Sequence, residues 1–423
     1  MLACAFPPEN LSGAARPHRF AKHLPHFGYD VEIIAGAHSE DLAGWRNVHR
    51  VPRQEQHPLR LRLESRLAGF IRRLAPYEER IPWIPHVVSE AGRILQMRRI
   101  GAVLSTSPPI AAHLAALHLK RRYGLKWIAD FRDPLLGNPF RTKIAGRSYD
   151  TALEWILFRH ADAVIANTDT LIEAWRRRYP CWTGKFHVIW NGYDPGDGIR
   201  PAPIPPRDHQ VLAHAGSIYG GRTPTILLAG LERLIARGRL DPKRIRVLLM
   251  GPMELRPEIV AAPPYSTLRE AGVLHWTGRA VPVAEARSAI SEADFLCLLD
   301  VNSRGVGIQV PAKLFDYIRV GRPILAVTAE NSPTHRILAR SGIRYRCLFS
   351  NTSEPLIDAQ LLKFFDLSTD PVSPSPWFCE SFDAWHQTRE LAQLVSSVLA
   401  GKGAQTNGTV PDPGGNSKAI IGI

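Results

Sequence analysis

Short, continuous apolar runs alternate with longer segments of helical periodicity along almost the whole chain. Continuous hydrophobic strands separated by helices are typical of parallel sheets covered on both faces. The first half contains the runs Val31–Ala35, Ala102–Ser105, Trp127–Phe131, Ala163–Asn167 and Phe186–Ile189. The second half contains Val211–Ala215, Arg246–Met250, Leu274–Trp276, Phe295–Leu299, Ile324–Val327 and Arg344–Leu348. This alternation predicts an α/β fold with two Rossmann-like, doubly wound domains.

A Pro- and Gly-rich stretch divides the two groups of strands. Residues 194–208 read as a linker, because their prolines and glycines exclude a helix or a central strand. We therefore expect an N-terminal domain over residues 1–193 and a C-terminal domain over 209–378. A helix at 379–400 is expected to pack back on the N-terminal domain, and the tail 401–423 is expected to be disordered. The 423 residues suffice for two cores.

The formal net charge of +14 favours anionic partners such as nucleic acid, an acidic membrane or phosphorylated substrates. The arginines are dispersed and no nucleic-acid-binding module is present, so we expect no nucleic-acid partner. The five cysteines form no Cys-x-x-Cys motif, which argues against a zinc site or disulfide framework. No run of about 18 apolar residues and no secretory signal is visible, so a cytoplasmic protein with reduced thiols is expected.

One segment carries the features of an anion site. Pro311 suits the first turn of a helix, and Gly321 suits its end. Lys313 and Asp316, three residues apart, share one face of the first turns. A lysine at a helix N-terminus binds anions, and an acid one turn on can accept hydrogen bonds from sugar hydroxyls. The segment therefore predicts a binding site for an anionic, hydroxyl-rich ligand such as a nucleotide-sugar.

Several motifs, in order, resemble those of the retaining glycosyltransferases of family four, in its exopolysaccharide branch. The similarity spans most of residues 1–400. The segments are Phe6–Glu9, Gly13–Pro17, Ser107–Pro109 with His113, Asp130–Pro134, Asn191–Asp194, His214–Arg222 and Lys313–Asp316. The resemblance implies the GT-B fold, in which two Rossmann-like domains face a central cleft. It also implies an acceptor-binding N-terminal domain and a nucleotide-sugar-binding C-terminal domain.

Two features depart from the family pattern. The family carries two acids eight residues apart, whereas Ile308 stands eight residues before Asp316 here. The first acid normally meets the transferred sugar, so backbone N–H groups of Gly305 to Ile308 would have to serve instead. The family's first strand also begins several residues earlier, so we expect either an upstream start codon or a shortened strand.

On the donor side, the resemblance implies that Gly216, Ser217 and Arg222 bind the pyrophosphate and that Lys313 adds a second charge. Asp316 would bind ribose hydroxyls. These residues could instead be an ordinary turn with a surface arginine, a solvated helix-start lysine and an acid that merely suits the helix dipole. The loop containing Arg279 and Val281 resembles the family's nucleobase loop, or is a plain loop.

On the acceptor side, His113 is expected to hydrogen-bond a sugar, or else to be a capping or surface histidine. Arg132 and Asp133 follow a strand's carboxyl end, where Asp133 could bind or deprotonate an acceptor hydroxyl. They could instead be a structural ion pair that fixes the turn. Gly13 and Arg16 would face the same cleft, with Arg16 near a phosphate.

Residues 58–74 form a basic amphipathic pattern. Leu59, Leu63, Leu67, Phe70 and Leu74 recur on one helical face, and arginines follow one flank. Such a helix can lie in an anionic membrane interface, or pack its leucines on the first domain.

The resemblance as a whole implies a retaining glycosyltransferase for polysaccharide biosynthesis, acting on a lipid-linked or polysaccharide acceptor. It would need no metal or cofactor, because Arg222 and Lys313 replace the cation, and it would sit in the cytoplasm or at the inner face of the membrane. The sequence is also compatible with a non-catalytic nucleotide-sugar protein, an inverting transferase or an epimerase of the same fold.

Overall fold

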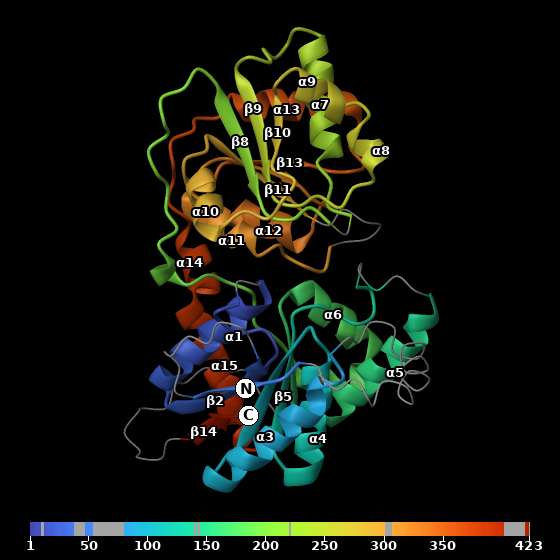
Figure 1. Ribbon diagram of the computed structural model, residues 1–423, viewed down its shortest axis with the longest axis vertical. Coiled ribbons are helices and arrows are strands. Elements are labelled where there is room, and N and C mark those ends of the chain that lie inside the picture. The colour runs from blue at the N-terminus through green and yellow to red at the C-terminus, as the bar shows by residue number, and fades with distance from the viewer. Residues whose placement is uncertain are drawn as a thin grey trace. The chain divides into compact units, whose positions relative to one another are not determined.

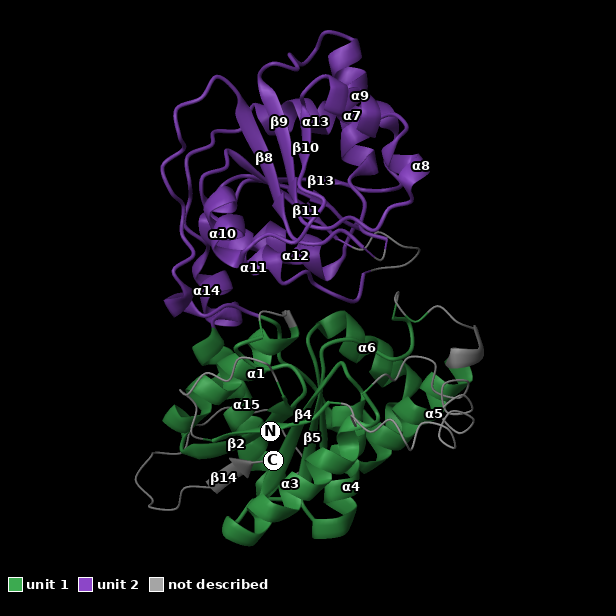
Figure 2. Ribbon diagram, in the orientation of Figure 1, with its two compact units in different colours: residues 1–191, 384–423 green, residues 192–383 purple. Residues whose placement is uncertain are grey.

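The computed structural model describes residues 1–9, 12–37, 47–53, 80–138, 141, 144–219, 221–300, 307–401 and 419–422. Residues 58–74, expected to form an amphipathic helix, lie outside these ranges. The chain divides into two compact units, Met1–Asn191 with Ala384–Ile423 (unit 1) and Gly192–Asp383 (unit 2) (Figure 2). No helix in the described ranges is long and apolar enough to span a bilayer.

Unit 1 is a parallel sheet with helices on both faces (Figure 1). Its strands are β1 (Leu2–Ala3), β2 (Tyr29–Gly36), β3 (Val48–Val51), β4 (Ala102–Ser107), β5 (Lys126–Phe131), β6 (Ala163–Ala166), β7 (Phe186–Val188) and β14 (Ala419–Gly422). Its helices are α1 (Ser12–His23), η1 (Leu24–Phe27), α3 (Trp83–Met97), α4 (Ala111–Tyr123), α5 (Ile144–His160), α6 (Asp169–Arg178), η2 (Pro180–Lys185) and α15 (Ala384–Leu399).

Successive residues of a strand enter opposite cores of unit 1. Val103 of β4 packs in the cluster formed with α3, α4, α5 and α6, whereas Leu104 packs in the cluster formed with α1 and α15. Side chains of a strand alternate between the two faces of a sheet, so the first half of β4 is apolar on both faces, and both faces are covered. This is the reason why the run reads as continuously hydrophobic.

The structure differs from the expectation of a disordered tail at Ala419–Gly422. This segment forms β14, and Ile421 lies opposite Val31 of β2 and Ala102 of β4. The two-residue strand β1 pairs with the same neighbours further along, with Leu2 opposite Ile34. Because β1 is so short, β2 and β4 retain unpaired backbone groups, and a segment with two β-branched residues pairs with them.

Unit 2 is a second parallel sheet, with the strand order β10-β9-β8-β11-β12-β13. Its strands are β8 (Gln210–Ala215), β9 (Ile245–Met250), β10 (Leu274–Trp276), β11 (Phe295–Leu299), β12 (Ile324–Val327) and β13 (Tyr345–Leu348). Its helices are η3 (Pro195–Asp197), α7 (Thr225–Ala236), α8 (Pro257–Val260), α9 (Tyr265–Glu270), α10 (Val283–Ser291), α11 (Lys313–Val320), α12 (Pro333–Arg340), α13 (Glu354–Phe365) and α14 (Pro376–Phe382). These two sheets confirm the predicted α/β fold class.

Candidate functional site

Three loops of unit 2 are tied together where they leave neighbouring parallel strands. They follow β8, β9 and β10 and contain Gly216, Gly251 and Thr277, respectively. The Gly216 N–H donates to the Met250 carbonyl at 2.6 Å, and the Gly251 N–H donates to Thr277 Oγ1 at 2.9 Å. Trp276 Nε1 donates to the Gly251 carbonyl at 3.0 Å. This carboxyl edge is where open α/β sheets bind ligands.

Lys313, the first residue of α11, lies along Gly216. A Cβ atom on Gly216 would fall 2.3 Å from Lys313 Cε and 2.6 Å from its Nζ. Burial, and then the charge of Arg222, lower the pKa of Lys313 to about 8, while Asp316 opposes the shift. The structure therefore brings four of the residues predicted for the donor side, Gly216, Arg222, Lys313 and Asp316, into one neighbourhood.

Arg222 supplies the second cation of this neighbourhood. Its guanidinium carbon lies 4.8 Å from the centre of the Tyr219 ring. The N–H groups of Ile218 and Arg222 donate to carbonyls within unit 2, as that of Gly216 does. A phosphate at this edge would therefore be held chiefly by the Lys313 and Arg222 side chains. Two neighbouring cations repel each other, and an anion would relieve that repulsion.

Tyr317 fixes α11 to the end of β8. Its fully buried hydroxyl accepts the Ala215 N–H at 2.9 Å, one residue before Gly216. His214, the residue before Ala215, is fully buried, and its Nδ1 lies 2.9 Å from the Cys297 carbonyl. Burial lowers the pKa of His214 to about 3, so the ring is neutral and structural.

The structure says less about the other residues that were predicted to bind the donor. Ser217 and Ile308 are partly buried, as is Val281, whereas Arg279 is exposed. The Arg279 carbonyl accepts from Thr277 Oγ1 at 3.2 Å, which joins its loop to the three tied loops. Residues 301–306 lie outside the described ranges, so the expectation that Gly305 contacts a sugar stays a prediction.

The side chain of Arg16 in unit 1 bonds other groups of the protein. It is 2% exposed and binds the Asp130 carboxylate through Nε and Nη2 at 2.8 to 3.2 Å. It also donates to the carbonyls of Ile189 and Trp190, while the Thr106 hydroxyl donates to Asp130. This placement does not provide the expected approach of Arg16 to a phosphate, because protein groups bond all three of its guanidinium nitrogens.

Arg132 gathers loop ends at the carboxyl edge of β4 and β5. Its guanidinium donates to the carbonyls of Ser107, Pro108 and Gly13. A Cβ atom on Gly13 would lie 2.9 Å from Arg132 Nη1. Arg132 and Gly13, both predicted to touch ligands, here position the start of α1.

His113 has no exposed surface, which corrects its expected contact with a sugar. Its Nδ1 lies 2.8 Å from Ser105 Oγ, and its ring centre lies 4.2 Å from that of Phe131. Burial lowers the pKa of His113 to about 3, so the ring is neutral. The helical pattern placed His113 at a helix start, but that position faces the core.

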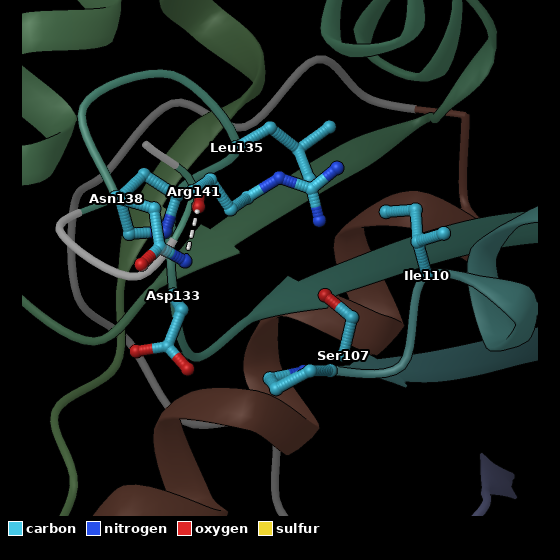
Figure 3. Close-up of a pocket in the computed structure, with 8 residues that line it drawn as sticks. Ser107, Ile110, Asp133, Leu135, Asn138 and Arg141 are labelled. Carbon is cyan, nitrogen blue, oxygen red and sulfur yellow. Dashed lines mark hydrogen bonds between the residues drawn. The ribbon is translucent and has the colours of Figure 1, made fainter. Parts of the chain in front are cut away.

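Asp133 lines a small pocket at the same edge of unit 1 (Figure 3). Ser107, Asn138 and Arg141 share the lining, and Asn138 Nδ2 donates to the Pro134 carbonyl at 3.1 Å. A carboxylate, a hydroxyl and an amide together can bind a ligand rich in hydroxyl groups. The ranges described contain no cluster of three or more His, Cys, Asp or Glu residues suited to a metal.

Sequence reasoning missed Tyr317, Thr277 and the pocket residues Asn138 and Arg141. Tyr317 had a usable signal, because it lies four residues after Lys313 and so on the same helical face. The other three residues lie in loops that follow strands. Such a position indicates the edge of the sheet where a ligand binds, but it does not identify the individual side chains that contact the ligand.

Residues 15–197 match the family model described as Glycosyltransferase Family 4. No curated protein matches the chain.

Solved structures match nearly the whole chain at low identity. The catalytic domain of starch synthase IV from Arabidopsis thaliana, bound to ADP and acarbose, is 9% identical, with a TM-score of 0.59, covering 96% of this chain and 99% of that one. Anabaena HepE in complex with UDP-glucose is 15% identical, with a TM-score of 0.56 and coverages of 94% and 98%. Sucrose-phosphate synthase from Thermosynechococcus elongatus is 12% identical, with a TM-score of 0.55 and coverages of 91% and 90%. At these identities the similarity establishes the fold alone.

Proposed function

We propose that this glycosyltransferase, whose residues 15–197 match Glycosyltransferase Family 4, moves a sugar from a nucleotide-sugar to an acceptor hydroxyl with retention of configuration. The observation that carries the proposal is Lys313 lying along Gly216, with Arg222 near enough for its charge to lower the pKa of Lys313. As the glycosidic bond of a nucleotide-sugar breaks, negative charge builds on the departing diphosphate. Fixed cations at that point stabilise the transition state.

The ligand class follows from the chemistry of this site and has support among the relatives. Asp316, on the same face of α11 as Lys313, suits the ribose hydroxyls of a nucleotide. The solved structures of Anabaena HepE and of starch synthase IV are described as complexes with UDP-glucose and with ADP. A nucleoside diphosphate moiety is common to both ligands.

The pocket of unit 1 is our candidate for the acceptor. Asp133 would orient an acceptor hydroxyl, and Asn138 and Ser107 would bind neighbouring hydroxyls. The β-phosphate of the donor would take the acceptor's proton, since His113 is completely buried and so does not reach an acceptor hydroxyl. We propose a lipid-linked or polysaccharide acceptor and a role in building cell-surface glycans.

We also propose that the reaction needs no metal. Lys313 and Arg222 carry the two positive charges that a divalent cation would otherwise place on the diphosphate. A chelator should therefore leave the rate of transfer unchanged.

A non-catalytic nucleotide-sugar protein is the second candidate, and Ile308 in the place of the family's first acid favours it. Such a protein would bind a diphosphate and never turn over the donor. An inverting transferase or an epimerase would share the same donor site.

The test is to incubate the purified chain with a panel of nucleotide-sugars and glycan acceptors, with and without chelator. The expected result is a product with retained anomeric configuration by NMR, formed at the same rate in chelator and lost in Lys313→Ala. Donor binding without turnover would support the non-catalytic candidate. An inverted product would identify an inverting transferase, and an epimerised nucleotide-sugar would identify an epimerase.

A further inference from the structure

Helix α5 in unit 1 exposes two large apolar side chains in succession. Trp155 is 43% exposed and Ile156 is 37% exposed. The ring centre of Trp182, in η2, lies 5.9 Å from that of Trp155, and Trp182 stacks on Tyr179 at 5.5 Å. We call these four residues, with Arg159 and Arg178 beside them, the α5–η2 surface.

Two arginines lie beside these rings, and one of them, Arg178, is also paired with Glu154 at 2.9 Å. Arg159 lies over the Trp155 ring at 5.1 Å, and Arg178 lies 6.0 Å from the Tyr179 ring. The stretch 147–185 is described throughout, and its only exposed acid is Glu173. Its exposed basic residues are Arg147, Arg159, Arg176, Arg177 and Arg178.

Further cations lie at the end of α5, together with one acid, Asp162, which pairs with Lys120 and Lys126. Lys185 donates to the carbonyls of Phe158, Arg159 and Ala161, which places its ammonium at the end of this helix. His160 at the same end lies 2.9 Å from an Arg121 nitrogen. The pKa of His160 is lowered by desolvation and then by four surrounding cations, Arg121, Arg159, Lys120 and Lys185.

We propose that the α5–η2 surface docks on an anionic lipid bilayer. Tryptophan favours the interface between lipid and water, where its ring is apolar and its N–H remains hydrated. Arginines beside it attract anionic headgroups, while their stems cover apolar surface. An exposed Trp–Ile pair flanked by arginines thus combines the two contributions that hold a protein on such a membrane.

The geometry disfavours two other partners. Arg159 covers a face of Trp155 and Tyr179 covers a face of Trp182, which leaves little aromatic face for the stacking of nucleic-acid bases. A second copy of the chain, joined through the same surface by twofold symmetry, would bring the arginines of both copies together. An anionic bilayer can bind the arginines through its headgroups and bury the apolar side chains of Trp155 and Ile156 in its interface.

The test uses the full chain and sedimentation with vesicles of phosphatidylcholine, with or without about 30% phosphatidylglycerol. The wild type should bind the vesicles that contain phosphatidylglycerol, bind pure phosphatidylcholine at least tenfold more weakly, and be released by salt. The double variant Trp155→Ser/Ile156→Ser should bind at least tenfold more weakly. The charge variant Arg159→Glu should lose binding by a similar factor and show a weaker salt dependence.

The double variant Leu356→Ser/Arg269→Glu is the matched control, since it removes one exposed apolar and one exposed basic side chain from unit 2. It should bind vesicles as the wild type does. Thermal unfolding, measured on every variant, reports on folding, and nucleoside diphosphate binding reports separately on the donor site. Equal binding to both kinds of vesicle, unchanged binding by both surface variants, or wild-type protein that only self-associates or binds RNA would overturn the proposal.

Discussion

Gly216 is a residue of the candidate donor site at which one added atom would disturb Lys313 directly. It has φ +123°, and a Cβ would overlap Lys313 Cε and Nζ. We expect Gly216→Ala to cost about 2 kcal/mol of unfolding free energy, from backbone strain. We also expect it to weaken nucleoside diphosphate binding about tenfold, because Lys313 must move. Denaturant unfolding and calorimetry measure the two effects.

The variant Gly272→Ala separates the effect of backbone strain from the effect of displacing Lys313. Gly272 also has a positive φ, of +67°, but a Cβ there would meet open space. This variant should lose some stability and retain full nucleotide affinity. Equal affinity in Gly216→Ala would contradict the placement of Lys313.

The lowered pKa of Lys313 predicts a pH dependence. In the folded chain this lysine holds its proton less tightly than in the unfolded chain, where its pKa is near 10.5. Lys313 therefore makes the fold more stable as pH rises through about 8. Diphosphate binding needs the charged form, so affinity should fall above pH 8, by up to about tenfold per pH unit. In Lys313→Arg, affinity measured between pH 7 and 9 should lose that dependence.

At the scale of elements, the sequence predicted best where one physical cause dominated. All eleven expected strands are present within one or two residues, because strands buried on both faces must be apolar throughout. Helix α11 ends as expected at Gly321, with φ +76°, and a Cβ there would lie 2.3 Å from the Val372 carbonyl. This position admits only glycine.

The strands that were missed lacked that signal. β3 contains His49 and Arg50 among its four residues, and β1 has only two residues. β14 follows a stretch whose glycines, asparagines and prolines indicate disorder. Their pairing with β2 or β4 helps to stabilise such segments, and that pairing is a long-range property of the fold.

At the scale of the whole molecule, the fold brings the predicted donor residues together. Several residues predicted to contact a ligand in unit 1 bond buried protein groups instead. Gly216, Arg222 and Lys313 come together because parallel strands end at one edge of the unit 2 sheet. Arg16, Arg132 and His113 also lie near strand ends, but they bind buried carboxylates, carbonyls and a hydroxyl. A sequence shows that a polar residue follows a strand. It does not show whether the side chain turns into the core.

The most direct test is calorimetric titration of UDP, GDP, ADP and dTDP into the wild type, Lys313→Ala and Lys363→Ala. Lys363 is an exposed lysine of α13 and serves as the matched control. We predict that one diphosphate binds, that Lys313→Ala weakens it at least tenfold, or about 1.4 kcal/mol, and that Lys363→Ala does not. Binding of none of the four, or equal binding by wild type and Lys313→Ala, would contradict the donor site.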